Sequence, residues 1–302
     1  MQVRMTTHCL NIADLQVRIC FSHEDERTGM HLLPSFAPFA SEAQKLEPLL
    51  FTMTVDQEKK EATGERVKEC ETGNSIIVVD RLSDGGYQFL IKNVGGEVCA
   101  LMQSNSDFSQ CCCNVLGESE AQRSFGLNNA MMLAYAFAGA RRGTLLVHAS
   151  VVRHDNKGYA FIARSGTGKS TQTQNWLKSI PGCDLMNDDN PVVRVIDGEA
   201  WIYGSPWSGK TPCYRQVKAP LAAVTKIVRD SSNHLERMSP VMGFKALVSS
   251  CSVMTWDTVS YRGICDTVSA IIERKGCFAL HCTADPESAV VCYNALNSDE
   301  TA

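Results

Sequence analysis

A glycine-bearing loop between an apolar segment and a stretch that can form a helix constrains this chain most. Residues 159–162 read Tyr-Ala-Phe-Ile, and residues 163–171 read Ala-Arg-Ser-Gly-Thr-Gly-Lys-Ser-Thr. In such loops the backbone N–H groups point inward and bind phosphate oxygens, aided by the positive end of the following helix. The pattern predicts a P-loop, and with it a nucleoside triphosphate and Mg²⁺ as ligands.

The P-loop pattern predicts a role for individual residues of the loop. Lys169 is expected to reach the β- and γ-phosphates, and the Ser170 hydroxyl is expected to ligate Mg²⁺. The loop opens with Ala163 where the usual pattern has Gly, which is a minor departure. The remaining positions expected to bind the phosphates are Ser165, Gly166, Thr167, Gly168 and Thr171.

The same pattern occurs a second time, at residues 204–211, which read Gly-Ser-Pro-Trp-Ser-Gly-Lys-Thr. Here Pro206 removes a backbone donor, and Pro212 biases the residue before it away from the helical region. A phosphate cradle needs a strand before it and a helix after it, so the first match is the predicted nucleotide loop. The second is interpreted as an active-site loop, because Lys210 and Arg215 would add positive charge there, with an ordinary turn as the alternative.

Composition narrows the class of protein further. The chain has 302 residues, 44% of them hydrophobic, which suffices for one large domain or two ordinary ones. Its net charge of −4 is mild, so nothing favours nucleic acid or an anionic membrane as a partner. Residues 1–20 carry charges, and the longest apolar run, 130–140, is too short to span a bilayer, so a cytoplasmic protein is expected. Its 14 cysteines lack zinc-type spacing and are expected to be free thiols.

The first part of the chain is predicted to be a small β-rich domain comprising residues 1–124. It contains short alternating or β-branched runs, and residues 83–86, Ser-Asp-Gly-Gly, resemble a hairpin turn. The charged stretch 56–66 is expected to be a solvated loop. The expected strands are 15–21, 49–55, 75–80, 87–92 and 97–102.

Residues 125–302 are predicted to form a second domain of mixed α/β type that contains the loop. The apolar stretch 127–140 favours a buried helix. A strand at 144–152 and a turn at 155–158 precede the strand that enters the loop, so these two strands are expected to pair antiparallel. Further strands are expected at 184–186, 192–196, 200–203 and 277–283, and helices at 239–248, 261–275 and 286–296, the last capped by Asp285.

Phosphoryl transfer needs more than a cradle: a carboxylate for the metal, a group that orients the acceptor, and positive charge. Asp188 and Asp189 follow a short apolar segment, 19 and 20 residues after Lys169. Adjacent residues on a strand point to opposite faces, so one carboxylate would face the metal and phosphates and the other the acceptor. The alternative is a plain turn, since Asn-Asp-Asp-Asn-Pro is a strong turn composition.

Three further residues are candidates with structural alternatives. His148 lies on the expected strand before the loop, where a structural role is the alternative. Glu199 follows an Asp-Gly turn and would serve as a metal-associated carboxylate, or simply be solvated. Trp207 would pack on a substrate or in the core.

Taken together, these segments resemble the catalytic domain of HPr kinase/phosphorylase, which shares its nucleotide-binding fold with ATP-dependent phosphoenolpyruvate carboxykinase. The resemblance rests on His-Ala-Ser at 148–150, the hairpin, Ser-Gly-Thr-Gly-Lys-Ser-Thr at 165–171 and Leu-Met-Asn-Asp-Asp at 185–189, and it covers roughly residues 125–295. It implies a carboxykinase-like P-loop domain and assembly into homo-oligomers. It also implies a general base at Asp188 and a helper or metal partner at Asp189, with the reverse order left open.

The resemblance implies an ATP- and Mg²⁺-dependent kinase that phosphorylates an alcohol: a serine of a protein or peptide, or a small hydroxylated molecule. In this hypothesis Lys210 or Arg215 neutralises charge. Residues 1–124 do not resemble the family's regulatory domain, and 203–213 look like its divergent relatives, so HPr is not assigned as the substrate. A nucleotide-binding regulator without phosphotransfer is the alternative. A carboxykinase-like lyase is disfavoured, because no set of arginines and metal ligands for a dicarboxylate is apparent.

Overall fold

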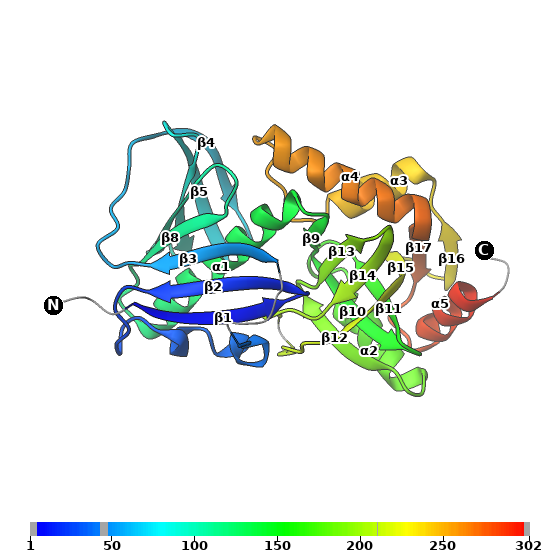
Figure 1. Cartoon of the computed structure of the whole chain (residues 1–302). Coiled ribbons are helices and arrows are strands. Elements are labelled where there is room, and N and C mark those ends of the chain that lie inside the picture. The colour runs from blue at the N-terminus through cyan, green and yellow to red at the C-terminus, as the bar shows by residue number, and fades with distance from the viewer. Residues whose placement is uncertain (1–4, 43–47, 210, 299–302) are drawn as a thin grey trace. The chain divides into compact units, whose positions relative to one another are not determined.

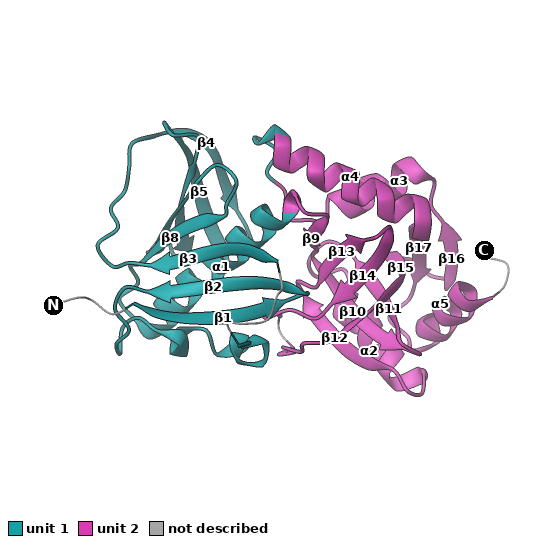
Figure 2. Cartoon of the chain, viewed as in Figure 1, with its two compact units in different colours: residues 1–139, 254–258 teal, residues 140–253, 259–302 magenta. Residues whose placement is uncertain are grey.

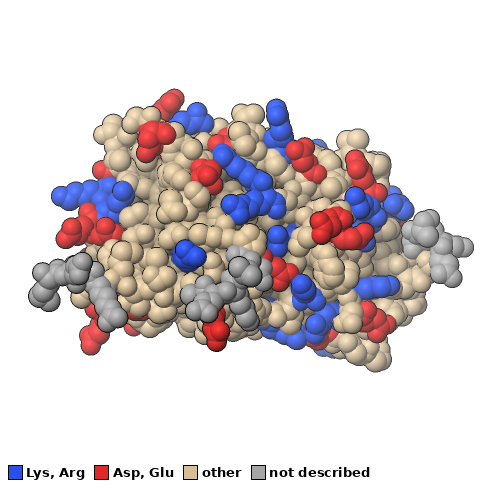
Figure 3. Space-filling model, viewed as in Figure 1, with Lys and Arg blue, Asp and Glu red and all other residues tan. Residues whose placement is uncertain are grey.

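The computed structural model describes residues 5–42, 48–209 and 211–298, and shows a mixed α/β chain with two mixed sheets (Figure 1). The chain divides into two compact units (Figure 2). Unit 1 comprises residues 1–139 and 254–258, and unit 2 comprises residues 140–253 and 259–302. Acidic and basic side chains are mixed over the face drawn in Figure 3, as the mild net charge indicates.

Unit 1 is built on an eight-stranded sheet in the order β1-β2-β3-β8-β7-β6-β5-β4. Strand β3 pairs in parallel with β2 and with β8, and the other neighbours pair antiparallel. The elements are β1 (Thr6–Ile12), β2 (Leu15–Phe21), η1 (Met30–Leu32), η2 (Pro34–Phe39), β3 (Leu49–Val55), β4 (Gly64–Glu71), β5 (Ser75–Leu82), β6 (Tyr87–Asn93), β7 (Val98–Ser104), β8 (Gln110–Val115) and α1 (Glu120–Ala140).

The alternating runs of unit 1 form strands as expected, and β2 and β3 have the predicted bounds. Strands β1, β4 and β8 were not predicted. Residues 64–66 of the expected solvated loop begin β4, so that expectation is wrong at its C-terminal end. In β8 the adjacent Cys111, Cys112 and Cys113 obscure the period of two, although Cys111 and Cys113 are buried and Cys112 is less so.

Helix α1 begins seven residues before the predicted start at 127. All of it except the last residue belongs to unit 1, so the division differs from the expected boundary after residue 124. The reason is aromatic packing: the Phe137 ring centroid lies 5.8 Å from that of Phe89 on β6 and 5.4 Å from that of Phe108. Aromatic contacts of this kind join the helix to the first sheet.

Unit 2 is built on a nine-stranded sheet whose main path is β12-β10-β11-β15-β14-β13-β9, with β17 also paired to β15 and β16 to β17. Strand β11 is antiparallel to β10, which confirms the predicted hairpin, and parallel to β15. The elements are β9 (Thr144–Leu146), β10 (Ala149–His154), β11 (Lys157–Ile162), α2 (Lys169–Ser179), β12 (Asp184–Asp189), β13 (Val192–Ile196), β14 (Glu199–Tyr203), β15 (Lys218–Arg229), β16 (His234–Arg237), α3 (Pro240–Val248), α4 (Thr258–Lys275), β17 (Phe278–Cys282) and α5 (Glu287–Asn297).

Helices cover both faces of this sheet. Successive residues of β11 point to opposite faces, so each face packs against different helices. Phe161 packs in one core with Trp176 of α2 and Ala289 of α5. Ile162 packs in the other core with Ile264 of α4. Both faces of β11 are therefore buried, which fixes the strand that leads into the glycine-bearing loop.

Several expectations for unit 2 are wrong. The predicted strand 144–152 breaks at 147–148, where the backbone N–H of His148 donates to Ser250 O at 2.6 Å. The strand predicted at 184–186 is longer, because β12 continues through Asp189, and this excludes the turn that was the alternative for the aspartate pair. Asp285 does not cap α5, whose N-cap residue is Pro286 with no side-chain cap.

Two further expectations concern the cysteines, predicted to be free thiols, and the apolar segments, predicted to be too short to span a bilayer. All 14 cysteines are free, and burial raises the pKa of the Cys183 thiol to about 12. Among the helices of the described residues, none combines the length and apolar character needed to cross a membrane.

Candidate functional site

The glycine-bearing loop, residues 163–168, connects β11 directly to α2, so the predicted strand–loop–helix order is confirmed. Gly166 and Gly168 have φ of 75° and 132°, in the region where a side chain is strained. Gly168 is the N-cap residue of α2, so the loop ends at the positive end of the helix. The exposed Ser165 and Thr171 lie on either side of these glycines.

Lys169 is buried at the start of α2, with 8% of its surface exposed. Its Nζ donates to Ala163 O at 3.2 Å and to His148 Nε2 at 2.7 Å. Burial lowers the pKa of Lys169, and the nearby carboxylates of Asp189 and Asp188 act in the opposite direction. The ammonium is thus held near the beginning of the loop by two acceptors, Ala163 O and His148 Nε2.

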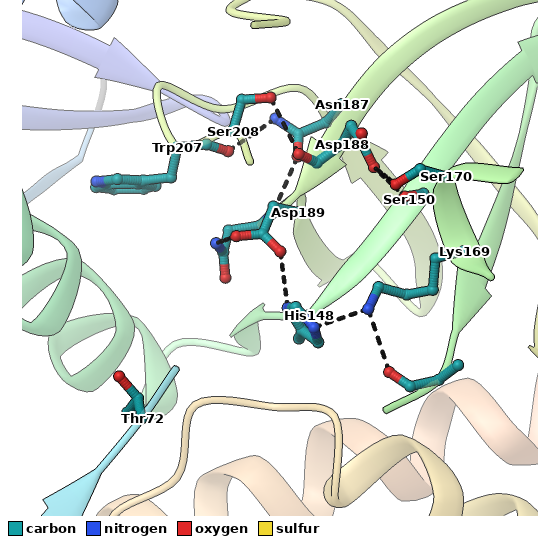
Figure 4. Close-up of polar contacts among 12 residues, drawn as sticks. Thr72, His148, Ser150, Lys169, Ser170, Asn187, Asp188, Asp189, Trp207 and Ser208 are labelled. Carbon is teal, nitrogen blue, oxygen red and sulfur yellow. Dashed lines mark hydrogen bonds and ion pairs between the residues drawn. The ribbon is translucent and has the colours of Figure 1, made fainter. Parts of the chain in front are cut away.

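His148 links Lys169 to the aspartate pair (Figure 4). Its Nδ1 lies 2.9 Å from Asp189 Oδ1. A lysine ammonium only donates, so Nε2 accepts and Nδ1 carries the proton that faces the carboxylate. The chain Asp189–His148–Lys169 therefore fixes both the tautomer of the ring and the direction of the carboxylate. His148 reaches this position because β9 and β10 are separated at 147–148.

Asp188 lies on β12, which is separated from β11 by β10, and is 5% exposed. The Ser170 hydroxyl donates to its Oδ1 at 3.0 Å, and the fully buried Ser150 donates to the same oxygen. A hydroxyl and a carboxylate oxygen are hard ligands of the kind that Mg²⁺ accepts. The two aspartates thus have different partners, as Figure 4 shows.

Asp189 has a backbone conformation that is rare for a residue with a side chain, with φ of 144°. Such strain persists only where the surroundings impose it. Its Oδ2 accepts from Asn190 Nδ2 at 2.8 Å, and its backbone forms a bridge with Ser208. The side chain of Asp189 remains 34% exposed, unlike that of Asp188.

Residues 204–209, the described part of the second match before Lys210, lie against the aspartate pair. Gly209 N donates to Asp188 O at 2.5 Å, and Ser208 Oγ donates to the same oxygen at 3.0 Å. The buried Asn187 donates from Nδ2 to Trp207 O at 3.1 Å and holds the loop to β12. No helix follows the described residues of the loop, since the next element is β15, so it lacks the context of a phosphate cradle. Trp207 is buried rather than presented to a substrate.

Arg215 does not join this cluster, contrary to the prediction. Its guanidinium pairs with Asp184 at 2.8 Å and donates to Leu185 O, at the beginning of β12 rather than its end. Burial alone would raise the pKa of Asp184, but hydrogen bonds from Arg153 and Arg215 outweigh it, so the pKa is lowered. Asp184 lies about 13 Å along the strand from Asp188 at the usual rise per residue.

Glu199 also lies apart from the cluster. Its side chain is 61% exposed and pairs with Lys275 at 3.5 Å and Arg274 at 4.0 Å, both on α4. Lys210 lies outside the described residues. Among the residues that the structure describes, no three His, Cys, Asp or Glu side chains gather as a metal-binding group.

Three residues of the site were missed by the sequence analysis: Ser150, Asn187 and Arg229. Ser150 and Asn187 stand within the segments that carry the resemblance, so a signal for them existed. Arg229 ends β15, which was not predicted; its Nε donates to Thr167 O at 3.0 Å and its Nη2 donates to Gly166 O.

No family model matches the chain, and no match was found among the curated proteins. The geometry of the loop and the aspartate pair is therefore what supports a function.

Proposed function

We propose that this protein is a divergent HPr kinase-like phosphotransferase that uses ATP and Mg²⁺ to phosphorylate an alcohol, foremost a serine of a protein or peptide. One observation carries the proposal. Two adjacent aspartates at the end of β12 meet the two polar residues that begin α2 immediately after the glycine-bearing loop, Ser170 directly and Lys169 through His148.

The loop supplies the binding site for the triphosphate of ATP. Its glycines allow the backbone N–H groups to turn inward, and α2 adds the positive end of its dipole. Lys169 is already directed at this region and is desolvated, so its charge acts on the phosphates with little screening. These groups bind and orient the donor, and orientation is most of what phosphoryl transfer asks of a protein.

Ser170 and Asp188 fit a magnesium ion. Their oxygens are 3.0 Å apart at the edge of the loop, and Mg²⁺ in such sites takes one or two protein ligands and completes its shell with phosphate and water. When bound, the ion neutralises charge on the β- and γ-phosphates. A cluster of three or more protein ligands is not required.

The geometry favours the reverse of the roles that the resemblance first implied. Asp188 is buried against Ser170, which suits the metal partner. Asp189 is more exposed, and His148 fixes its carboxylate, which suits the group that orients the acceptor. In the transfer, the acceptor oxygen bonds to the γ-phosphorus, the bond to the bridging β-phosphate oxygen breaks, ADP leaves, and the hydroxyl proton passes to Asp189.

The test is Mg²⁺-dependent ATP turnover with a panel of acceptors: HPr, serine peptides, free serine and cyclitols. Turnover should depend on one acceptor and fall at least about 100-fold in Asp189→Asn, which keeps its shape but not its basicity. Lys169→Ala should lose ATP binding as well. Arg262→Ala, an exposed residue of α4, is the control. ATP binding that is lost in Lys169→Ala, with no turnover on any acceptor, would contradict the kinase and favour the nucleotide-binding regulator.

A further inference from the structure

The two glycines of the loop have no packing partners on the side where a Cβ would lie. A Cβ placed on Gly166 or Gly168 would meet no atom within 4 Å, so both residues stand in open space. Glycines also lose the most conformational freedom when they become ordered. A phosphate cradle is nevertheless effective only if its N–H groups are held in place before the ligand arrives. Other groups must therefore restrain the backbone around the glycines; Lys169 Nζ does so at Ala163 O, at the beginning of the loop.

Arg229 contacts the backbone of the loop at these positions. Strand β15 runs parallel to β11, with Ile162 paired to Lys226, so β15 continues past the point where the loop begins. From its last residue, Nε donates to Thr167 O at 3.0 Å and Nη2 donates to Gly166 O. The strand end is fixed in turn, because Asp230 N donates to Cys282 O of β17 at 3.0 Å.

These contacts suit the electrostatics of a cradle. When successive N–H groups point inward to an anion, their carbonyl partners can point outward and need donors. A guanidinium presents a rigid planar fork of donors whose spacing suits two neighbouring carbonyls, whereas an ammonium is a compact charge without this fixed geometry. A positive donor on a carbonyl also polarises the peptide unit, which strengthens the N–H groups of the loop as donors.

We propose that Arg229 is the positioning residue of the phosphate cradle, which sets the affinity for the polyphosphate of the nucleotide without touching it. The inference rests on the proposed function in one respect, that residues 163–171 bind a nucleotide. Because the contact is with the loop and not with Asp189 or Ser170, substitution should raise KM for ATP and leave kcat at saturation within about twofold.

The test compares wild type with Arg229→Ala, Arg229→Gln and Arg229→Lys by calorimetric titration with Mg-ATP and with tripolyphosphate. Arg229→Ala should bind both about tenfold more weakly, since two charge-assisted hydrogen bonds are lost. An equal loss of affinity for the two ligands would show that Arg229 affects binding of the phosphates rather than of the nucleoside. Arg229→Lys should recover part of the affinity and Arg229→Gln less. Arg262→Ala is the matched control, an exposed arginine away from the loop.

Amide hydrogen exchange without nucleotide supplies a second readout. Amides of residues 164–168 should exchange faster in Arg229→Ala and unchanged in Arg262→Ala. Unchanged exchange, or wild-type affinity for both ligands in Arg229→Ala, would overturn the inference while leaving the kinase intact. A wild-type protein that binds neither ligand would overturn the proposed function, and with it the claim about affinity.

Discussion

Asp189 combines a strained backbone with the carboxylate that we propose orients the acceptor. Its φ of 144° is accessible to glycine, and conformations of this kind cost a residue with a side chain about 1–3 kcal/mol. The contact with His148 Nδ1 and the bridge to Ser208 hold it there. The placement of the carboxylate thus reduces stability, as is common where catalytic groups are positioned.

This cost can be isolated by comparing Asp189→Gly with Asp189→Ala. Both variants lose the carboxylate and should lose turnover equally. Only glycine relieves the strain, so Asp189→Gly should be more stable than Asp189→Ala by about 1 kcal/mol in urea unfolding. Equal stability of the two variants would show that the backbone at this position is not strained.

Asn187 acts at the residue scale by holding the loop of residues 204–209 to β12. Its amide is fully buried and donates to Ser205 and Trp207. Asn187→Ala removes these buried hydrogen bonds and the acceptor of Asn190 N, which donates to Asn187 Oδ1 at 3.0 Å, and should lower the free energy of unfolding by about 2 kcal/mol. Turnover should fall with it, because Ser208 of the same loop bridges Asp189. Urea unfolding and kcat measure the two effects; a drop in stability with unchanged kcat would separate the loop from the chemistry.

At the scale of elements, sequence patterns predicted those strands, loops and helices that are determined by residues close together in the chain. The glycines and the apolar run of residues 159–162 were enough to predict β11, the loop and α2. The break at 147–148 was not predictable, because Val147 bridges Cys251, about a hundred residues away. Arg229 was missed for a related reason: its role follows from the pairing of β15 with β11, and Pro220 and the small residues of β15 weaken its pattern.

Arg215 provides a prediction at this scale, because it joins the segment before β15 to the beginning of β12. Arg215→Met should reduce stability at pH 7 by less than about 1 kcal/mol, since the pair with Asp184 is partly exposed. It should leave kcat within about threefold, because Arg215 does not reach the aspartate pair. A decrease in kcat much larger than threefold would indicate that Arg215 is a catalytic residue after all.

The pH dependence follows from the lowered pKa of Asp184. A carboxyl whose pKa is lower in the folded state stabilises the fold above its ordinary value of 3.8 and loses this contribution as the pH falls through the folded value. The stability difference between wild type and Arg215→Met should therefore be constant near neutrality and shrink below pH 3.8. Urea unfolding measured from pH 7 downward checks the sign.

At the scale of the whole molecule, the division into units cuts the chain in three places. Residues 254–258 belong to unit 1, where Asp257 accepts from the Tyr87 hydroxyl at 2.9 Å and Trp256 O accepts from Arg81 at 3.0 Å. The sequence predicted a single boundary, because a change of composition along the chain indicates only one. The return of residues 254–258 to unit 1 depends on contacts between residues far apart in the sequence. A fragment that begins at residue 125 would also carry most of α1, residues 125–140, without the aromatic partners of Phe137.

Because the glycine-bearing loop, both aspartates and Arg229 all belong to unit 2, nucleotide binding should stabilise that unit in particular. Mg-ATP at about 100 times its Kd should add about 2.7 kcal/mol to the opening free energy of the best-protected amides of β11 and β15. Amides of β5 and β6 in unit 1 should gain much less, provided that the units open separately. Hydrogen exchange on the full chain measures both, with Lys169→Ala as the control. Equal gains in the two sheets would mean that the units open as one cooperative body, and no gain in either would argue against nucleotide binding.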